Sequence, residues 1–300
     1  MCLPRYVSLY YFATDYRFLT FSSEGTSQFV LKEIPQDWAT RNDVYHRAAD
    51  CHHIRLPIDT VPEKRMLVFK YSNEELLSLV QKDLPRALVK RILKSTFHGI
   101  AALHDVDIIH NDIKANNILV HIVATPTGIE VERVELTDLE DALHSSSPLL
   151  KGAAIGNWMW RSPEAHAKGP MNKPSDVFAF GIVCIYAMTK AFIFAVDNPA
   201  LSKEDKIATV LFRQVSYFSA QGKSAFRGLL EYLGDDNPER EMLEAIEEGL
   251  KDIPREPFIH WQDMNLDDEF KDLVSRMCRL DPRERITAQE VLGHRWWKDV

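Results

Sequence analysis

Residues 110–120 of the chain read HNDIKANNILV, and they carry the strongest information about its fold. They follow apolar residues at helical spacing in 84–104 and lead into a run of β-branched residues, so they connect a helix to a strand. The Asp112 carboxylate can accept a hydroxyl proton, the Lys114 ammonium can neutralise a moving phosphoryl group, and the Asn117 amide oxygen can hold Mg²⁺. A polar turn between a helix and a strand is the alternative interpretation of these residues.

A second carboxylate follows at the end of a predicted hairpin. Residues 117–138 have strand character, with ILVHIVA and IEVERVEL joined by TPTG, and Asp138 closes the segment. Hard oxygen ligands on either side of a hairpin can hold Mg²⁺ between a triphosphate and the protein. A Thr-Asp pair after a strand is often only a turn. Its spacing from Asp112 favours the metal site.

These residues resemble the motifs of the protein kinase superfamily. HNDIKANN resembles the catalytic loop, and TDLE resembles the metal-binding DFG segment. Downstream, GNWMWRSPE, SDVFAFGIV and LDPRERITAQEVLGHRWW resemble the end of the activation segment, the buried central helix and the family's closing segment. Upstream, FVLKEI resembles the VAIK strand, and MLVFKY resembles the strand before the hinge. The motifs occur in the family's order and cover essentially the whole chain.

The resemblance implies an α+β, bilobal fold. A small antiparallel β-rich N-lobe is expected in residues 1–71 and a larger, mainly α-helical C-lobe in 72–300, which together form one kinase domain. The residue pattern agrees, because three segments before residue 35 have strand character, namely 6–12, 16–21 and 29–34. SSEGT reads as a hairpin turn between the last two. One-sided apolar faces in 84–104 and 270–278 predict helices, and Thr287 with Glu290 forms a capping box for a last short helix.

The resemblance also implies roles for the residues of the larger lobe. Asp112 would be the catalytic base that orients the substrate hydroxyl, and Lys114 would contact the γ-phosphate of ATP. A lysine at that position is the Ser/Thr-kinase pattern, so the expected substrates are Ser or Thr hydroxyls of proteins. Asn117 and Asp138 would hold Mg²⁺.

The smaller lobe would supply the rest of the nucleotide site. Lys32 would grip the α- and β-phosphates, although a strand lysine taken alone is more often a surface charge. Phe69 falls at the gatekeeper position, and the adenine-binding hinge would be formed by Lys70, Tyr71 and Ser72.

Three further residues have structural roles in the family. Glu164 should pair with Arg285, an ion pair that anchors the activation segment. If this pair is buried, removing one partner is costly. Asp176 should accept hydrogen bonds from the backbone of the catalytic loop.

The chain departs from the family pattern at the phosphate-binding end. No glycine-rich loop precedes Lys32, although that loop lets backbone N–H groups approach the phosphates closely. The helix glutamate that pairs with the strand lysine is also missing. Asp43 and Asp50 are the acidic residues available in RNDVYHRAADCHH, and Asp43 fits the spacing better.

Further departures surround the catalytic loop. Glu140 replaces the glycine of DFG and puts another negative charge beside the metal site, while Leu139 can replace the apolar packing of the phenylalanine. Asn111 replaces the arginine that binds a phosphorylated activation loop, so phosphorylation there is not expected to switch the protein. Asn157 replaces a threonine that touches the catalytic Asp and Lys, and its amide can make similar hydrogen bonds.

Composition excludes several other classes of protein. A net charge of −8 and a pI near 5.8 argue against nucleic acid or an anionic membrane as a general partner. The 4 cysteines lie far apart, which excludes the usual zinc spacings and a disulfide framework and suits buried, reduced thiols. The N-terminus does not resemble a signal peptide, and the longest apolar run is shorter than the roughly 20 residues that span a bilayer. A cytoplasmic or nuclear location is therefore expected.

Three functions agree with this sequence. The first is an ATP- and Mg²⁺-dependent protein kinase, favoured because Lys32, Asp112, Lys114, Asn117 and Asp138 are all present. The second is a pseudokinase that acts as a nucleotide-binding or protein-interaction scaffold, favoured by the missing glycine loop and by Glu140. The third is a small-molecule kinase of the aminoglycoside-phosphotransferase kind, which the SPE segment and Arg285 argue against. The protein substrate, the upstream regulator and the oligomeric state are left open.

Overall fold

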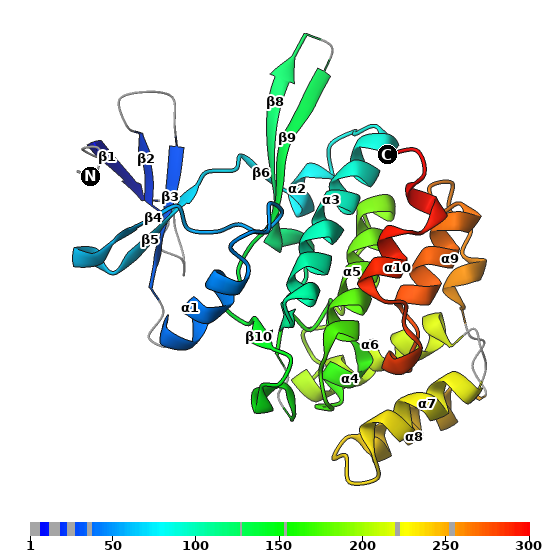
Figure 1. Ribbon diagram of the computed structural model, residues 1–300. Helices are drawn as coiled ribbons and strands as arrows, with labels where there is room; N and C mark the ends of the chain where they lie inside the picture. The colour runs from blue at the N-terminus through cyan, green and yellow to red at the C-terminus, as the bar shows by residue number, and fades with distance from the viewer. Residues whose placement is uncertain are drawn as a thin grey trace.

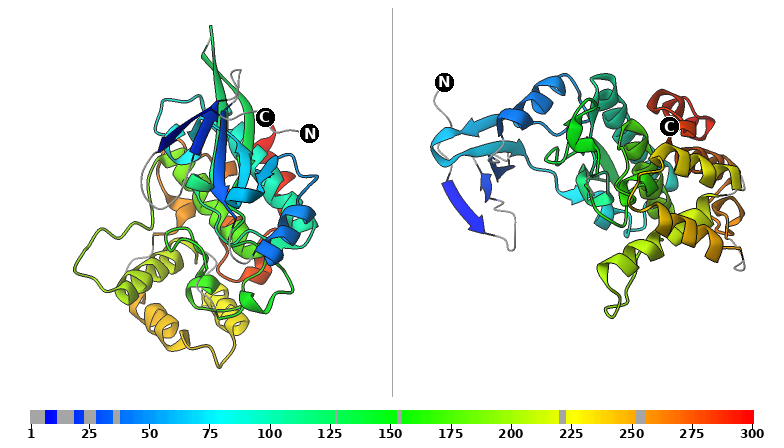
Figure 2. Two further views of the ribbon diagram at one scale, coloured as in Figure 1. Left: turned by 90° about the vertical axis from the view of Figure 1, so that its left-hand side faces the viewer. Right: turned by 90° about the horizontal axis from the view of Figure 1, so that it is seen from below.

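The computed structural model describes residues 7–11, 19–22, 28–34, 38–126, 128–152, 155–219, 223–251 and 256–300. A β-rich N-terminal part is followed by a mainly helical C-terminal part, and the two lie side by side (Figure 1). The view from below separates the same two parts (Figure 2). The predicted α+β, bilobal architecture is therefore confirmed, while the boundary between residues 71 and 72 stays a prediction.

The N-terminal part is built on a five-stranded antiparallel sheet of order β1-β2-β3-β5-β4. Its strands are β1 (Val7–Tyr11), β2 (Leu19–Ser22), β3 (Gln28–Glu33), β4 (Asp59–Val61) and β5 (Met66–Lys70). The continuous apolar run of β5 is buried from Met66 to Phe69, as expected for a strand inside a sheet. Helix α1 (Trp38–Arg47) lies beside this sheet (Figure 1). The predicted turn at SSEGT lies almost entirely outside the described residues.

A second, three-stranded sheet begins the C-terminal part. Strand β6 (Glu74–Glu75) pairs with β8 (Ile118–Thr125), which forms the predicted hairpin with β9 (Gly128–Leu136). The far end of this hairpin projects from the body of the molecule (Figure 1). A short ladder joins β7 (Ile108–Ile109) to β10 (Leu143–His144). The segment between β7 and β8 is the predicted catalytic loop, and the β9–β10 connection carries Asp138.

Helices form the remainder of the C-terminal part. The α-helices are α2 (Leu76–Leu79), α3 (Arg86–Asp105), α4 (Pro163–His166), α5 (Lys173–Thr189), α6 (Lys203–Phe218), α7 (Lys223–Leu233), α8 (Arg240–Gly249), α9 (Asp268–Met277) and α10 (Ala288–Leu292). The short 3₁₀ helices of this part are η2 (Ala115–Asn117), η3 (Pro148–Leu150), η4 (Phe258–His260), η5 (Pro282–Glu284) and η6 (Arg295–Trp297), while η1 (Pro62–Lys64) connects β4 to β5 in the N-terminal part. Among the described residues, no helix has both the length and the apolar character needed to cross a membrane.

Helix α5 is the centre of this part. It is apolar all round and buried along most of its length, as expected for a helix enclosed by others. It contacts α3 and α9, whose predicted apolar faces are buried against the core. The predicted capping box of Thr287 and Glu290 opens α10 and is confirmed. Cys184 and Cys278 are buried free thiols in this core, Cys51 is half-buried and free, and Cys2 lies outside the described residues.

Candidate active site

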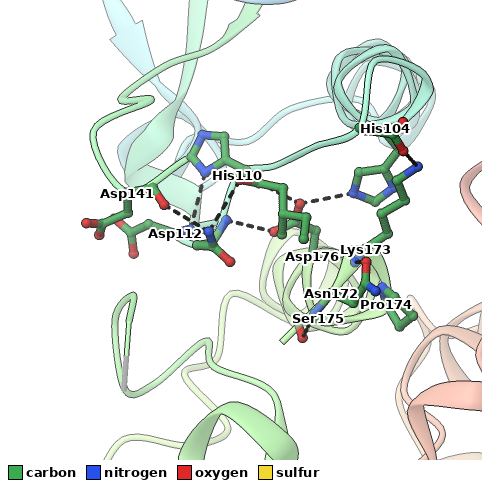
Figure 3. A network of polar contacts seen from close by, with 12 residues as sticks. His104, His110, Asp112, Asp141, Asn172, Lys173, Pro174, Ser175 and Asp176 are labelled. Atoms are coloured by element: carbon green, nitrogen blue, oxygen red, sulfur yellow. Dashed lines mark hydrogen bonds and ion pairs between the residues drawn. The ribbon is translucent and has the colours of Figure 1, made fainter. Parts of the chain in front are cut away.

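The backbone of the catalytic loop is held by Asp176, which is 1% exposed in the first turn of α5. Its Oδ2 accepts the His110 backbone N–H at 2.8 Å, and its Oδ1 accepts the Asn111 N–H at 2.9 Å (Figure 3). Oδ2 also lies 3.0 Å from Nε2 of His104. The N-terminus of a helix favours a negative charge. The predicted role of Asp176 is confirmed.

His110 links the loop to the end of the β8–β9 hairpin. Its Nε2 lies 3.0 Å from the Thr137 carbonyl, so this nitrogen carries the proton. Its Nδ1 accepts the Asp112 backbone N–H at 3.3 Å (Figure 3). Asn111 has a φ of 65°, a conformation that asparagine tolerates, and donates to the Asp141 carbonyl at 2.9 Å. The loop is thereby fixed to the segment that carries Asp138.

The Asp112 carboxylate lies at the centre of the predicted catalytic group and is 7% exposed. Its Oδ2 accepts from Lys114 Nζ at 2.5 Å and from Asn117 Nδ2 at 3.1 Å. Its Oδ1 accepts from the Asn157 backbone N–H at 2.9 Å. The structure therefore brings Asp112, Lys114 and Asn117 together. The expectation for the Asn157 amide is wrong, because that side chain accepts from Met159 N–H while the backbone bonds Asp112.

Gly156 lets the activation segment approach the catalytic loop. Its φ is 82°, in the left-handed region that favours glycine. A Cβ at this position would lie 2.3 Å from the Asn111 carbonyl oxygen. The close approach places the neighbouring Asn157 N–H on Asp112, so Gly156 is needed for both conformation and space.

Lys32 reaches across from β3 to the segment after β9. Its Nζ donates to Asp138 Oδ1 at 2.6 Å and also contacts the Glu140 carboxylate. Burial lowers the pKa of Lys32, but the two carboxylates outweigh burial and raise this pKa above its usual value. Burial likewise raises the pKa of Asp138, and Lys32 outweighs it, so this pKa is lowered. Asp138 has a φ of 67°, which aspartate tolerates.

The partner of Lys32 was left open by the sequence, and the described contacts of Lys32 do not include Asp43, the better-spaced acidic residue. Asp43 is exposed on α1 and accepts from Arg47 Nε at 2.7 Å, one helical turn along the same helix. Asp50 is exposed as well. Glu140, which the sequence presents as a defect of the metal segment, supplies a negative charge to Lys32 instead.

A cavity of about 530 Å³, within the range of small-molecule sites, adjoins these groups, although neither Asp112 nor Glu140 lines it. The predicted residues that line it are Lys32, Phe69, Tyr71, Ser72, Lys114, Asn117 and Asp138. Lys70 does not line it: its side chain is exposed, and its carbonyl accepts from Arg55 Nη2 at 2.8 Å. The lining thus comes from both parts of the fold.

Several lining residues were not found from the sequence, and three of them carry titratable side chains, namely Tyr45, Arg55 and Glu75. Burial raises the pKa of Tyr45 to about 12, so its hydroxyl stays protonated near Lys32. Burial also raises the pKa of Glu75, and the nearby Asn116 lowers it by less. None of the three belongs to a short motif, so the sequence carries no local signal for them.

Glu164 and Arg285 form the predicted ion pair. The two guanidinium nitrogens of Arg285 donate to the two Glu164 oxygens at 2.6 and 2.7 Å, and both side chains are fully buried. Ser175 Oγ donates to the same carboxylate at 2.8 Å. Burial raises the pKa of Glu164, but Arg285 outweighs it and the pKa is lowered. The prediction is confirmed, and the pair joins α4 to the segment before α10.

Comparison with known proteins identifies the family. The family model for the protein kinase domain matches residues 43–297, which is most of the chain. The chain therefore belongs to the protein kinase family. The matched range begins after Lys32, so the assignment of Lys32 depends on its geometry.

The curated relatives are Ser/Thr kinases at low identity. The chain is 27% identical over 255 residues to the serine/threonine-protein kinase srb10 of Schizosaccharomyces pombe, covering 76% of this chain and 62% of that protein. It is 25% identical over 296 residues to the serine/threonine-protein kinase SSN3 of Mycosarcoma maydis, covering 91% and 38%. It is 26% identical over 247 residues to the probable cyclin-dependent kinase 8 of Dictyostelium discoideum, covering 78% and 61%. The chain thus spans less than two thirds of the length of these relatives.

Proposed function

We propose that the chain is a nucleotide- and Mg²⁺-dependent phosphotransferase that moves the γ-phosphate of ATP to Ser or Thr hydroxyls of proteins. One observation carries this proposal: Lys32, Lys114, Asn117 and Asp138 line a single cavity, and Asp112 is bonded to two of them. Phosphoryl transfer requires mainly positioning and charge stabilisation, which this arrangement supplies.

Asp112 is the proposed catalytic base. Its carboxylate is held by Lys114, Asn117 and the Asn157 N–H, so its orientation is fixed before a substrate arrives. It accepts a proton from the substrate hydroxyl. Lys114, which bonds Asp112 and lines the cavity, neutralises charge on the transferred phosphoryl group.

Asn117 and Asp138 are the proposed Mg²⁺ ligands. The Asn117 amide nitrogen makes both of its hydrogen bonds to Asp112, which turns the amide oxygen away from that residue. Asp138 presents a carboxylate whose pKa is lowered by Lys32 despite burial, so it is charged at neutral pH. Amide and carboxylate oxygens are ligands that suit Mg²⁺. The ion, when bound, would neutralise the charge of the phosphates.

Lys32 is the proposed phosphate-binding lysine, and Glu140 positions it. Asp138 is both a partner of Lys32 and a proposed metal ligand. The Glu140 carboxylate gives the ammonium a counter-ion of its own, in place of a glutamate on α1. This arrangement supports the proposal without an acidic residue from the helix.

A phosphate-transfer assay tests this function. Generic protein substrates and autophosphorylation would be measured with radiolabelled γ-phosphate for the unmodified chain and for Asp112→Asn. We expect transfer by the unmodified chain and a loss of at least about a hundredfold in the variant, because general-base catalysis typically contributes that much. Transfer no greater than that of the variant would remove the proposal.

A pseudokinase is the second candidate. The connection between β1 and β2, residues 12–18, reads FATDYRF and offers no glycine for backbone contacts to phosphates. In that case the cavity binds a nucleotide, or a protein docks on the fold, and no phosphate is transferred. Nucleotide binding that raises the unfolding temperature without any transfer supports this candidate. A cytoplasmic or nuclear location is part of either proposal.

A further inference from the structure

The cavity wall beside the predicted hinge contains a buried arginine. Arg55 lies in the connection between α1 and β4 and lines the cavity. Its backbone N–H donates to the Leu136 carbonyl at 2.8 Å, which fixes its position. The residue is 9% exposed. Its guanidinium carbon lies over the ring of Phe69, the predicted gatekeeper, 5.1 Å from the ring centre, which is within cation–π distance.

This arginine is hydrogen-bonded to a backbone carbonyl of the predicted hinge. Its Nη2 donates to the Lys70 carbonyl oxygen at 2.8 Å. The next carbonyl along, that of Tyr71, accepts from Arg133 Nη2 at 2.9 Å. Two successive carbonyls of residues 70–72 are therefore bonded to guanidinium groups, and only Arg55 of these two arginines lines the cavity.

Arg55 has donors left for a ligand. A guanidinium carries five N–H donors, and the Arg55 guanidinium makes its printed side-chain hydrogen bond through Nη2 while the residue lines the cavity. A guanidinium has no acceptor of its own, so a ligand that presents an acceptor at this wall is favoured over one that presents a donor. The wall at this point offers hydrogen-bond donors where a free Lys70 carbonyl would offer an acceptor.

We propose that the cavity binds purine nucleotides with a carbonyl oxygen at position 6, of the guanine type, more tightly than ATP. Guanine presents O6 and N7 as acceptors, which arginine binds in bidentate fashion, whereas adenine presents an amino donor at the same edge. That amino group would meet a guanidinium and a carbonyl that is already bonded. The inference rests on the proposed function and adds only which purine base the site binds more tightly.

Binding measurements on the full chain test the inference. Isothermal titration calorimetry with Mg-ATP, Mg-GTP and Mg-ITP gives three dissociation constants under one set of conditions. ITP carries the 6-oxo group without the 2-amino group of guanine, so it isolates the contact to Arg55. We expect GTP and ITP to bind about tenfold or more tightly than ATP, in line with the discrimination of a bidentate arginine contact.

Two variants and one matched control locate the effect. Arg55→Val removes the guanidinium and frees the Lys70 carbonyl. ATP should therefore bind more tightly, and the preference for GTP and ITP should disappear or reverse. Arg55→Lys keeps the charge without the planar fork and should reduce the preference, which provides a second readout if the valine variant fails to fold. Arg91→Met removes a guanidinium at an exposed position of α3, outside the cavity lining, and should leave the preference unchanged.

The outcomes separate this inference from the proposed function. ATP binding as tight as that of GTP and ITP in the unmodified chain overturns the inference and leaves the proposed phosphotransferase intact. A preference that persists in both Arg55 variants also overturns it. Absence of binding by all three nucleotides removes both proposals.

Discussion

At the scale of single residues, the site depends on how one ammonium group is shared. Lys32 bonds Asp138 and contacts Glu140, which lie in the same short segment, and no acidic residue of α1 takes part among its described contacts. Burial alone would favour the neutral amine, but the carboxylates raise the pKa of Lys32 above its usual value. The lysine therefore stays charged, and Glu140 becomes a positioning residue.

Glu140→Gln tests that role. We expect the rate of phosphate transfer to fall by about tenfold, because a loss of about 1.4 kcal/mol in positioning Lys32 corresponds to that factor. The measurement is steady-state kinetics with varied nucleotide and Mg²⁺. Glu63→Gln, at an exposed position on η1, is the control and should be neutral. A faster Glu140→Gln enzyme would instead show that Glu140 only repels the metal and phosphates.

At the scale of elements, two contacts hold the activation segment in place. Both lie in its closing stretch, residues 156–164: Gly156 packs against the Asn111 carbonyl, and the Glu164–Arg285 pair fixes α4. The first contact requires a residue without a Cβ. The second requires two buried, oppositely charged side chains that bond in bidentate geometry. Both are expected to be sensitive to single substitutions.

Gly156→Ala is expected to lower both stability and activity. The Cβ would lie 2.3 Å from a backbone oxygen at a φ of 82°, so the segment must move. A left-handed alanine alone costs about 1–2 kcal/mol, and displacement of the Asn157 N–H from Asp112 should lower the rate. Thermal unfolding and phosphate transfer measure the two effects. Gly249→Ala, at the end of α8 with open space at its Cβ, is the control and should leave stability unchanged or slightly raised.

Glu164→Gln is expected to lower the free energy of unfolding by about 3–5 kcal/mol, because Arg285 is left as a buried charge without its counter-ion. Urea unfolding at pH 7 measures this change. Glu248→Gln, in an exposed ion pair with Lys251, is the matched control and should change stability by less than about 1 kcal/mol. Equal effects of the two variants would contradict the importance of the buried pair.

The same pair predicts a pH dependence with a definite sign. The pKa of Glu164 in the folded chain lies below its ordinary value of 4.5, because Arg285 outweighs burial. Its contribution is therefore fully present above the unfolded pKa and is lost as the pH falls through the folded pKa. The stability difference between the unmodified chain and Glu164→Gln should be constant from pH 7 to about pH 5 and should shrink at lower pH. A difference that grows on acidification would contradict the pairing.

At the scale of the whole molecule, the cavity is lined by both parts of the fold. Lys32 and Phe69 come from the N-terminal sheet, while Asn117 and Asp138 come from the loop and the hairpin end of the C-terminal part. A nucleotide bound there contacts both parts at once. Binding should therefore stabilise the chain by mass action, by about 2.7 kcal/mol at a ligand concentration of 100 times Kd.

Asp138→Asn should remove the Mg²⁺ dependence of that stabilisation. In the unmodified chain, the rise in unfolding temperature with nucleotide is expected to be larger with Mg²⁺ than with EDTA, because Asp138 is a proposed metal ligand. In the variant, the two conditions should give the same rise. Asp59→Asn, exposed on β4, is the control. An unmodified chain that responds equally in Mg²⁺ and EDTA would contradict the proposed metal site.

The parts of the molecule that follow short-range patterns could be predicted from the sequence. The apolar faces of α3 and α9, the enclosed helix α5 and the capping box of α10 all follow from side chains a few positions apart. The hairpin of β8 and β9 follows from two strand-like runs joined by a short turn. The roles of Asp176 and of the Glu164–Arg285 pair came from the family resemblance, and their hydrogen bonds agree with it.

The sequence by itself determined the fold class and the side chains proposed for the site, because periodic patterns and motifs can be recognised from residues that lie close together in the chain. Only the tertiary structure decided the partner of Lys32, the use of the Asn157 backbone in place of its side chain, and the position of Arg55 on the Lys70 carbonyl. Each of these contacts joins segments that are distant in the chain. Their geometry depends on the relative placement of whole elements, and differences of a few ångströms in that placement change which charges and hydrogen bonds meet.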